Sequence, residues 1–67
     1  MNIPKSQIRF IVGNLHVFTP DEEVRAEIGR RVEGQPAWTN SLIRRAIKYA
    51  LQIHHEHQKL VRDFRLL

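Results

Sequence analysis

The sequence has no cysteine, and this absence removes two ways of stabilising a small protein. A chain of 67 residues without cysteine has neither disulfides nor a zinc site built on thiolates. Apolar residues make up 42% of it, near the globular norm, but so short a chain buries only a modest fraction of its surface. Association with further copies is the remaining route to a sufficient core, so the sequence predicts an oligomer.

Long apolar runs are also missing. No stretch approaches the ~20 apolar residues of a membrane-spanning helix, and the first residues do not have the layout of a signal peptide. We therefore expect a cytoplasmic protein, in a prokaryotic, phage or viral host cell, with no membrane partner.

Acidic residues are outnumbered by basic ones. Eleven Lys and Arg against seven Asp and Glu leave a formal net charge of +4, and the sequence pI is about 10.4. A basic domain of this kind is compatible with nucleic acid, an anionic membrane surface or an acidic protein. Charge alone does not choose among these partners.

Patterns that carry catalysis or bind a cofactor are absent as well. The chain has no Gly-rich phosphate loop, no plausible Ser-His-Asp set and no paired carboxylates of a cleft. His54 and His57 are three residues apart and can share a helix face, but further metal ligands are lacking, so we interpret them as solvated or interfacial. We expect no enzyme, no cofactor and no metal.

Residues 7–18 are rich in β-formers and predict a strand. Apolar side chains occupy alternate positions in two runs, which are Ile8, Phe10 and Val12, and then Leu15 and Val17. The phase of this alternation changes at Gly13, and a bulge there would keep all five side chains on one face. The alternative is that only one half of the segment is a strand.

A first helix is expected directly afterwards. Thr19-Pro20-Asp21-Glu22 is a strong helix start, with Thr19 as the cap, Pro20 at the first helical position and Glu22 completing a capping box. A narrow apolar stripe follows, made of Val24, Ile28 and Val32. Gly34 is expected to end this helix.

A longer apolar stripe follows a second helix start at Thr39 or Asn40. Its members are Ile43, Ala46, Ala50, Ile53, Leu60, Phe64 and Leu67, with His57 completing the three-four spacing. The pattern predicts one long helix, or two helices that break near His54-His55. A stripe this long on a small domain needs a partner surface. We expect Tyr49 at the edge of the core, and Trp38 either covering the dimer core or lying at a DNA or partner surface.

The stretch Asn40-Ser41-Leu42-Ile43-Arg44-Arg45-Ala46-Ile47 resembles the second-helix motif of ribbon-helix-helix repressors, the Arc and plasmid copy-control type. That family opens this helix with a small polar residue, then a polar residue, an apolar pair, an arginine and Ala-Ile. Gly34 falls in the turn between the helices, as in the family. The resemblance covers about residues 8–52; both the strand region and the segment from 34 to 40 are longer than the family's.

The resemblance implies an α+β, mostly helical fold of strand, helix and helix, with a C-terminal helical extension, in an intertwined homodimer. It divides the chain into a flexible arm (1–6), a DNA-binding domain (7–52) and the extension (53–67). One strand from each chain would form a two-stranded ribbon in the major groove of DNA. The dimer core would consist of Ile8, Phe10, Val12, Leu15, Val17, Ile43, Ile47 and Ala50.

The family also implies two sets of DNA contacts. The polar face of the strand would read bases through Gln7, Arg9, Asn14 and His16. The start of the second helix would clamp a phosphate, and the phosphate-binding set would be Lys5, Thr39, Asn40, Ser41, Arg44 and Arg45. An ordinary helix cap and a solvated charged face would explain the same residues without DNA.

We therefore expect a sequence-specific double-stranded DNA-binding protein, a transcriptional repressor that occupies its operator as a dimer. An antitoxin or a plasmid transfer or partition accessory protein would use the same fold, with the C-terminal helix available to a protein partner. A helical protein-interaction module without a DNA role is the third hypothesis.

Overall fold

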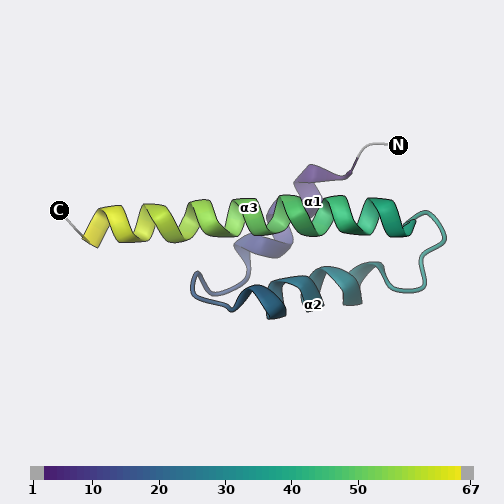
Figure 1. The fold of residues 1–67 in the computed structure, drawn as a ribbon, viewed down its shortest axis with the longest axis horizontal. Coiled ribbons are helices and arrows are strands. Elements are labelled where there is room, and N and C mark those ends of the chain that lie inside the picture. Colours follow the sequence, from purple (N-terminus) through teal and green to yellow (C-terminus); the bar gives the residue numbers. More distant parts are fainter. Residues whose placement is uncertain (1–2, 66–67) are drawn as a thin grey trace.

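The computed structural model describes residues 3–65, which form three helices (Figure 1). Helix α1 spans Lys5–Gly13, α2 spans Asp21–Val32, and α3 spans Asn40–Arg65. Helix α3 runs the length of the molecule, α2 lies alongside it, and α1 crosses it near its middle (Figure 1). Both short helices pack on α3 and on each other.

No strand occurs between residues 3 and 65, so the prediction of an α+β ribbon-helix-helix fold is wrong. The expected strand is helix α1 and the loop after it. Ile8, Ile11 and Val12 are buried at the three-four spacing of a helix, whereas Phe10, which the alternating pattern placed inside, is 68% exposed. The buried side chains therefore follow the three-four spacing of a helix and not the alternation of a strand. The intertwined ribbon dimer, which required the strand, is overturned with it.

Helix α1 begins inside the segment expected to be a flexible arm. Its first residue is Lys5, and the carbonyl of Pro4 accepts a hydrogen bond from the backbone N–H of Ile8. Ile3 packs against the core. At the other end, the side-chain amide of Asn14 donates to the carbonyl of Phe10 at 2.7 Å.

Helix α2 begins next to the expected start but without the expected capping box. Pro20 is the cap residue, in an extended conformation, and no side chain in the described part of the chain caps this helix. Three acidic residues in the first turn stabilise the positive end of the helix dipole instead. At its C-terminal end, Gly34 has φ +76°, the left-handed conformation that favours glycine after a helix. The stop at Gly34 and the buried stripe of Val24, Ile28 and Val32 are confirmed.

Helix α3 is one continuous helix of 26 residues. The Thr39 hydroxyl accepts a hydrogen bond from the N–H of Leu42 at 3.2 Å, so Thr39 is the cap. Ala46 and Ala50 are fully buried, and their small side chains let α1 and α2 lie close to α3. The boundary expected at residue 53 falls inside this helix, and Leu67 of the apolar stripe lies outside the described residues.

The core lies within one chain. Of the side chains expected in a dimer core, Ile8, Val12 and Ala50 are buried between the three helices. Four others are half-buried, namely Leu15, Val17, Ile43 and Ile47. Trp38 and Tyr49 pack against this core, as expected for Tyr49. Trp38 covers a core within one chain and not the dimer core that was one of the two interpretations.

Three polar side chains of α3 contact the loop between α1 and α2 or the first residue of α2. The buried His54 donates its Nε2–H to the carbonyl of Thr19 at 2.7 Å, and Gln58 donates to the carbonyl of Val17 at 3.1 Å. His55 Nε2 lies 3.0 Å from both carboxylate oxygens of Asp21. The first turn of α2 is therefore fixed against the middle of α3.

The molecule is elongated, with extents of 46 × 20 × 16 Å. The second part of α3, residues 55–65, extends past the other two helices (Figure 1); we call it the tail. None of the helices in residues 3–65 is both long and apolar enough to cross a membrane.

Candidate nucleic-acid interface

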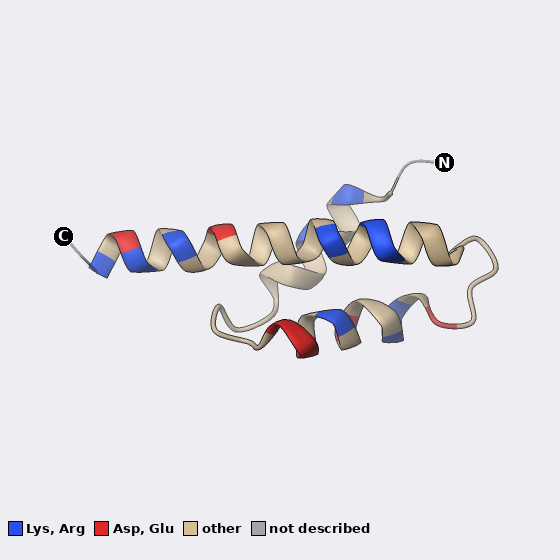
Figure 2. Ribbon diagram, in the orientation of Figure 1, with Lys and Arg blue, Asp and Glu red and all other residues tan. Residues whose placement is uncertain are grey.

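Charges are distributed unevenly over the three helices (Figure 2). All acidic residues before the tail lie in α2 or directly after it: Asp21, Glu22, Glu23, Glu27 and Glu33. Helix α1 and residues 40–54 of α3 contain no acidic residue, and their basic residues are Lys5, Arg9, Arg44, Arg45 and Lys48. We call these five residues the basic face. No acidic residue of α1 or of residues 40–54 neutralises its positive potential.

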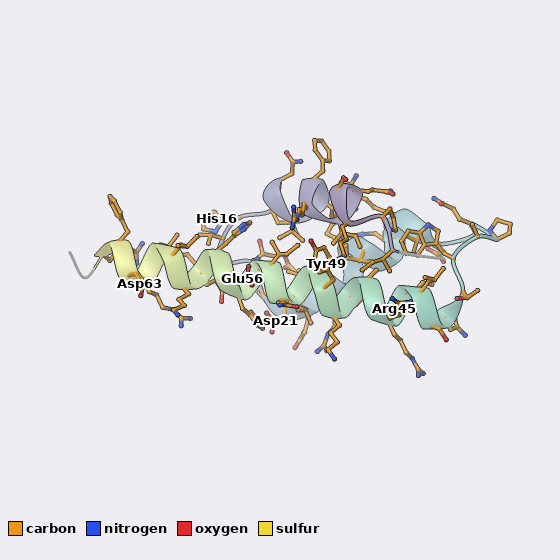
Figure 3. All side chains as sticks on the ribbon, turned by 90° about the horizontal axis from the view of Figure 1, so that it is seen from above. His16, Asp21, Arg45, Tyr49, Glu56 and Asp63 are labelled. Atoms are coloured by element: carbon orange, nitrogen blue, oxygen red, sulfur yellow. The ribbon has the colours of Figure 1, made fainter. Side chains whose placement is uncertain are left out.

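Tyr49 joins α1 to α3 within the basic face. It lies on the side of α3 that faces α1 (Figure 3), and its hydroxyl accepts a hydrogen bond from Arg9 Nε at 2.8 Å. The ammonium of Lys5 lies 5.8 Å from the centre of the Tyr49 ring, within range of a cation–π interaction. Because the bond uses only Nε, the two terminal nitrogens of Arg9 keep their donors for an anion.

The other basic side chains extend this surface along α3. Arg45 lies one turn before Tyr49, so the two side chains are neighbours on the helix surface. Arg44 and Lys48 are also one turn apart, on the side of α3 opposite the buried Ala46 and Ala50. The basic face therefore covers the side of α3 near α1 and the solvent side, and leaves out the side against α2.

The start of α3 lies at one end of the basic face. Its first turn contains no acidic residue, and its first N–H groups have no partner within the helix. Asn40 and Ser41 are exposed there, and their backbone N–H groups belong to the positive end of the helix dipole. This end lies about 12 Å from Tyr49 along the helix axis.

The residues expected to read bases do not share a surface. Gln7 and Arg9 would align on a strand, but in α1 their directions differ by about 160° around the helix axis. The amide of Asn14 is bound to the end of α1, and Nδ1 of His16 accepts a hydrogen bond from the backbone N–H of Phe18 at 3.1 Å. The structure thus separates this set, which depended on the alternation of a strand.

The residues expected to bind phosphate divide into three groups. Lys5 lies beside Arg9 at Tyr49, with Arg45 one turn away. Arg44 is exposed on the solvent side of α3. The remaining three, Thr39, Asn40 and Ser41, begin α3, where the Thr39 side chain is engaged as the cap.

Sequence reasoning did not include Lys48 and Tyr49 in this surface. A signal for both was present, because Lys48 follows Arg44 and Tyr49 follows Arg45 by one helical turn. The contact of Tyr49 with Arg9 was not visible, since it requires α1 to be a helix that crosses α3.

The histidines do not assemble a metal site. His54 is buried and bound to a backbone carbonyl, while His57 is exposed one turn later. Within residues 3–65, no group of three or more His, Asp or Glu side chains is arranged to hold a metal ion. Comparisons with protein-family models, curated proteins and solved structures find no match to this chain.

Proposed function

We propose that this protein binds double-stranded DNA through phosphate contacts made by its basic face. The single observation that carries the proposal is the separation of charge, with five basic residues and no acid on α1 and the first part of α3. A β-ribbon has no part in this mode of binding. The helices present the cations directly.

The chemistry of the basic face suits phosphate. Three of its five cations are arginines, whose planar guanidinium groups form paired hydrogen bonds to phosphate oxygens. The start of α3 adds backbone N–H donors about 12 Å from Tyr49. That separation exceeds the spacing of successive phosphates along one strand, about 3.4 Å along the DNA axis, so one molecule can contact several phosphates.

An anionic membrane surface would attract the same charges but fits the structure less well. A helix that lies in a membrane interface inserts an apolar face between its flanking cations. In residues 40–54 of α3 that apolar face is buried under α1 and α2. On α3 the basic face therefore presents a polar surface, which suits the DNA backbone better.

The test is a titration of a labelled duplex followed by fluorescence anisotropy at about 50 mM and about 200 mM salt, where phosphate-driven binding differs strongly. The variant R44Q/R45Q/K48Q removes three charges of the basic face. We expect this variant to lose affinity at least about tenfold. The slope of the logarithm of the binding constant against the logarithm of salt concentration should become shallower by up to about 2.7, because each phosphate contact contributes about 0.9 to that slope.

The matched control is R25Q/R30Q/R31Q, which removes three charges from α2 and reduces the net charge equally. Its affinity is expected to stay close to that of the wild type. Equal losses in both variants would show that only net charge matters and would overturn the assignment of the site. Absence of binding by the wild type at low salt would overturn the proposed function. Binding to phosphatidylserine vesicles but not to duplex would replace DNA by a membrane surface.

Repression of transcription requires in addition that binding selects a sequence. Selection of bound duplexes from a random pool tests this directly. An enriched motif supports occupancy of an operator, whereas a pool that stays random limits the protein to binding the DNA backbone.

A further inference from the structure

The apolar stripe of α3 continues beyond the part of the helix that the rest of the chain covers. Its members follow one another at spacings of four and three residues: Ala46, Ala50, Ile53, His57, Leu60 and Phe64. This is the heptad spacing of helices that pack side by side. The stripe thus stays on one face of α3 from its buried part to its last described turn.

The two parts of the stripe differ in exposure. Ala46, Ala50 and Ile53 are buried against α1 and α2, whereas Leu60 and Phe64 are 66% and 78% exposed. The polar contacts of the tail lie away from its apolar stripe: His55 meets Asp21 at the start of α2, and Gln58 and Arg65 meet the loop between α1 and α2. No helix among residues 3–65 covers the apolar face of the tail.

The radius of gyration and the exposed surface area indicate how much surface a partner would bury. The radius of gyration is 12.8 Å, compared with about 11 Å for a compact domain of this length. The chain exposes 5170 Å², whereas a compact monomer of 7.9 kDa exposes about 4,400 Å². The excess is comparable to the about 800 Å² that each partner buries in a standard protein interface.

We propose that the tail pairs with the tail of a second copy of this chain, antiparallel, through Leu60 and Phe64. Helices α1 and α2 occupy the stripe side of α3 over residues 46–53, so a parallel partner helix would collide with them. In the antiparallel arrangement the two cores lie at opposite ends, and each tail covers the stripe of the other. Leu60 then lies near the two-fold axis, and His57 lies opposite Phe64 of the partner subunit.

The charges of the tail permit this approach. Lys59, Arg62 and Arg65 are nearly balanced by Glu56 and Asp63. Lys59 lies within one helical turn of both Glu56 and Asp63, so a positive charge lies next to each carboxylate of the tail. The pairing is independent of the proposed DNA binding, because it uses a different part and a different face of α3.

Sedimentation equilibrium over a series of concentrations tests the dimer. We expect the wild type to shift from monomer to dimer as its concentration rises, and L60E/F64E to remain monomeric. Both side chains are exposed in the monomer, so this variant is expected to keep its helical circular dichroism. The control F10E changes a similarly exposed side chain on α1 (68%) and is expected to dimerise like the wild type.

A wild type that stays monomeric at its highest soluble concentration would overturn the proposal. A dimer that survives L60E/F64E would also overturn it.

Disulfide trapping tests the orientation, because the chain has no cysteine of its own. A mixture of H57C and F64C is expected to form a crosslinked pair of the two variants, while each variant alone is not. Crosslinking of each variant with itself and not with the other would show a parallel pair and would contradict the antiparallel arrangement.

Discussion

The two parts of α3 have the same apolar pattern and different surroundings. In residues 40–54 the stripe is the centre of the core, whereas in the tail it faces solvent. Helices α1 and α2, with nine and twelve residues, are about 14 and 18 Å long, and α3 is about 39 Å long. An amphipathic pattern thus determines which face of a helix can be buried, but the lengths of its neighbours determine how much of that face is buried.

Truncating the stripe at equivalent positions in the two parts should give the largest contrast. Ile53 and Leu60 are one heptad apart, but only Ile53 is buried, at 8% exposure. We expect I53A to lower the free energy of unfolding by about 2–5 kcal/mol, because it removes buried methylene groups and leaves a cavity. L60A should change it by less than about 0.5 kcal/mol in dilute monomer.

Urea denaturation followed by circular dichroism measures both values. The comparison fails if L60A destabilises dilute monomer as strongly as I53A, since the tail face would then be covered within the chain.

A second contrast concerns the histidines on either side of the boundary between the two parts. His54 is buried and donates to the carbonyl of Thr19, whereas His57 is exposed. H54A should lower the free energy of unfolding by about 2 kcal/mol, because it leaves a carbonyl without its donor. H57A should leave it within about 0.5 kcal/mol of the wild type. Thermal denaturation of the two variants at one low concentration compares them, and equal midpoints would refute the role of His54.

A smaller effect is expected at the edge of the first part of α3. Y49F removes the hydroxyl that accepts the hydrogen bond from Arg9. Because water can replace this acceptor for an exposed guanidinium, we expect a loss of about 0.5 kcal/mol in the free energy of unfolding. The same measurement on R9Q should give a similar loss, and the double variant should add little to either. Fully additive losses would show that the contact contributes nothing.

The smallest effect is expected for the pair that links the tail to α2. Asp21 and His55 are both substantially exposed, with side-chain exposures of 43% and 53%. Exposed pairs contribute little, so D21N should change the free energy of unfolding by no more than about 0.5 kcal/mol. A double-mutant cycle with H55A isolates the interaction. A coupling well above that value would mean that the first turn of the tail is held as firmly as the core.

Helices with clear ends were predictable from the sequence. The stripe of Val24, Ile28 and Val32 and the stop at Gly34 are local properties of the chain, and both are confirmed. Helix α1 was mistaken for a strand because its short apolar run satisfies two periods, and only burial of Ile11 in place of Phe10 distinguishes them. The choice between them depends on packing against α3, which no local pattern contains.

The candidate interface was predictable in four of its five basic residues, all but Lys48, and not in its arrangement. Lys5, Arg9, Arg44 and Arg45 were all named from the sequence, and none of them is buried. Which of them lie together depends on the crossing of α1 over α3 at Tyr49. That crossing depends on the packing of α1 against buried residues of α3 that are far away in the sequence.

The bond from Gln58 to the loop has a consequence for how the protein opens. It is the last hydrogen bond among the described residues that ties α3 to another part of the chain. Amides in the final turns can therefore exchange with solvent through fraying of the helix end, at little cost in free energy. Amides around Ala46 and Ala50 are expected to exchange with solvent only through global unfolding. A gradient of hydrogen exchange should thus run along a single unbroken helix and become less steep when the tails associate.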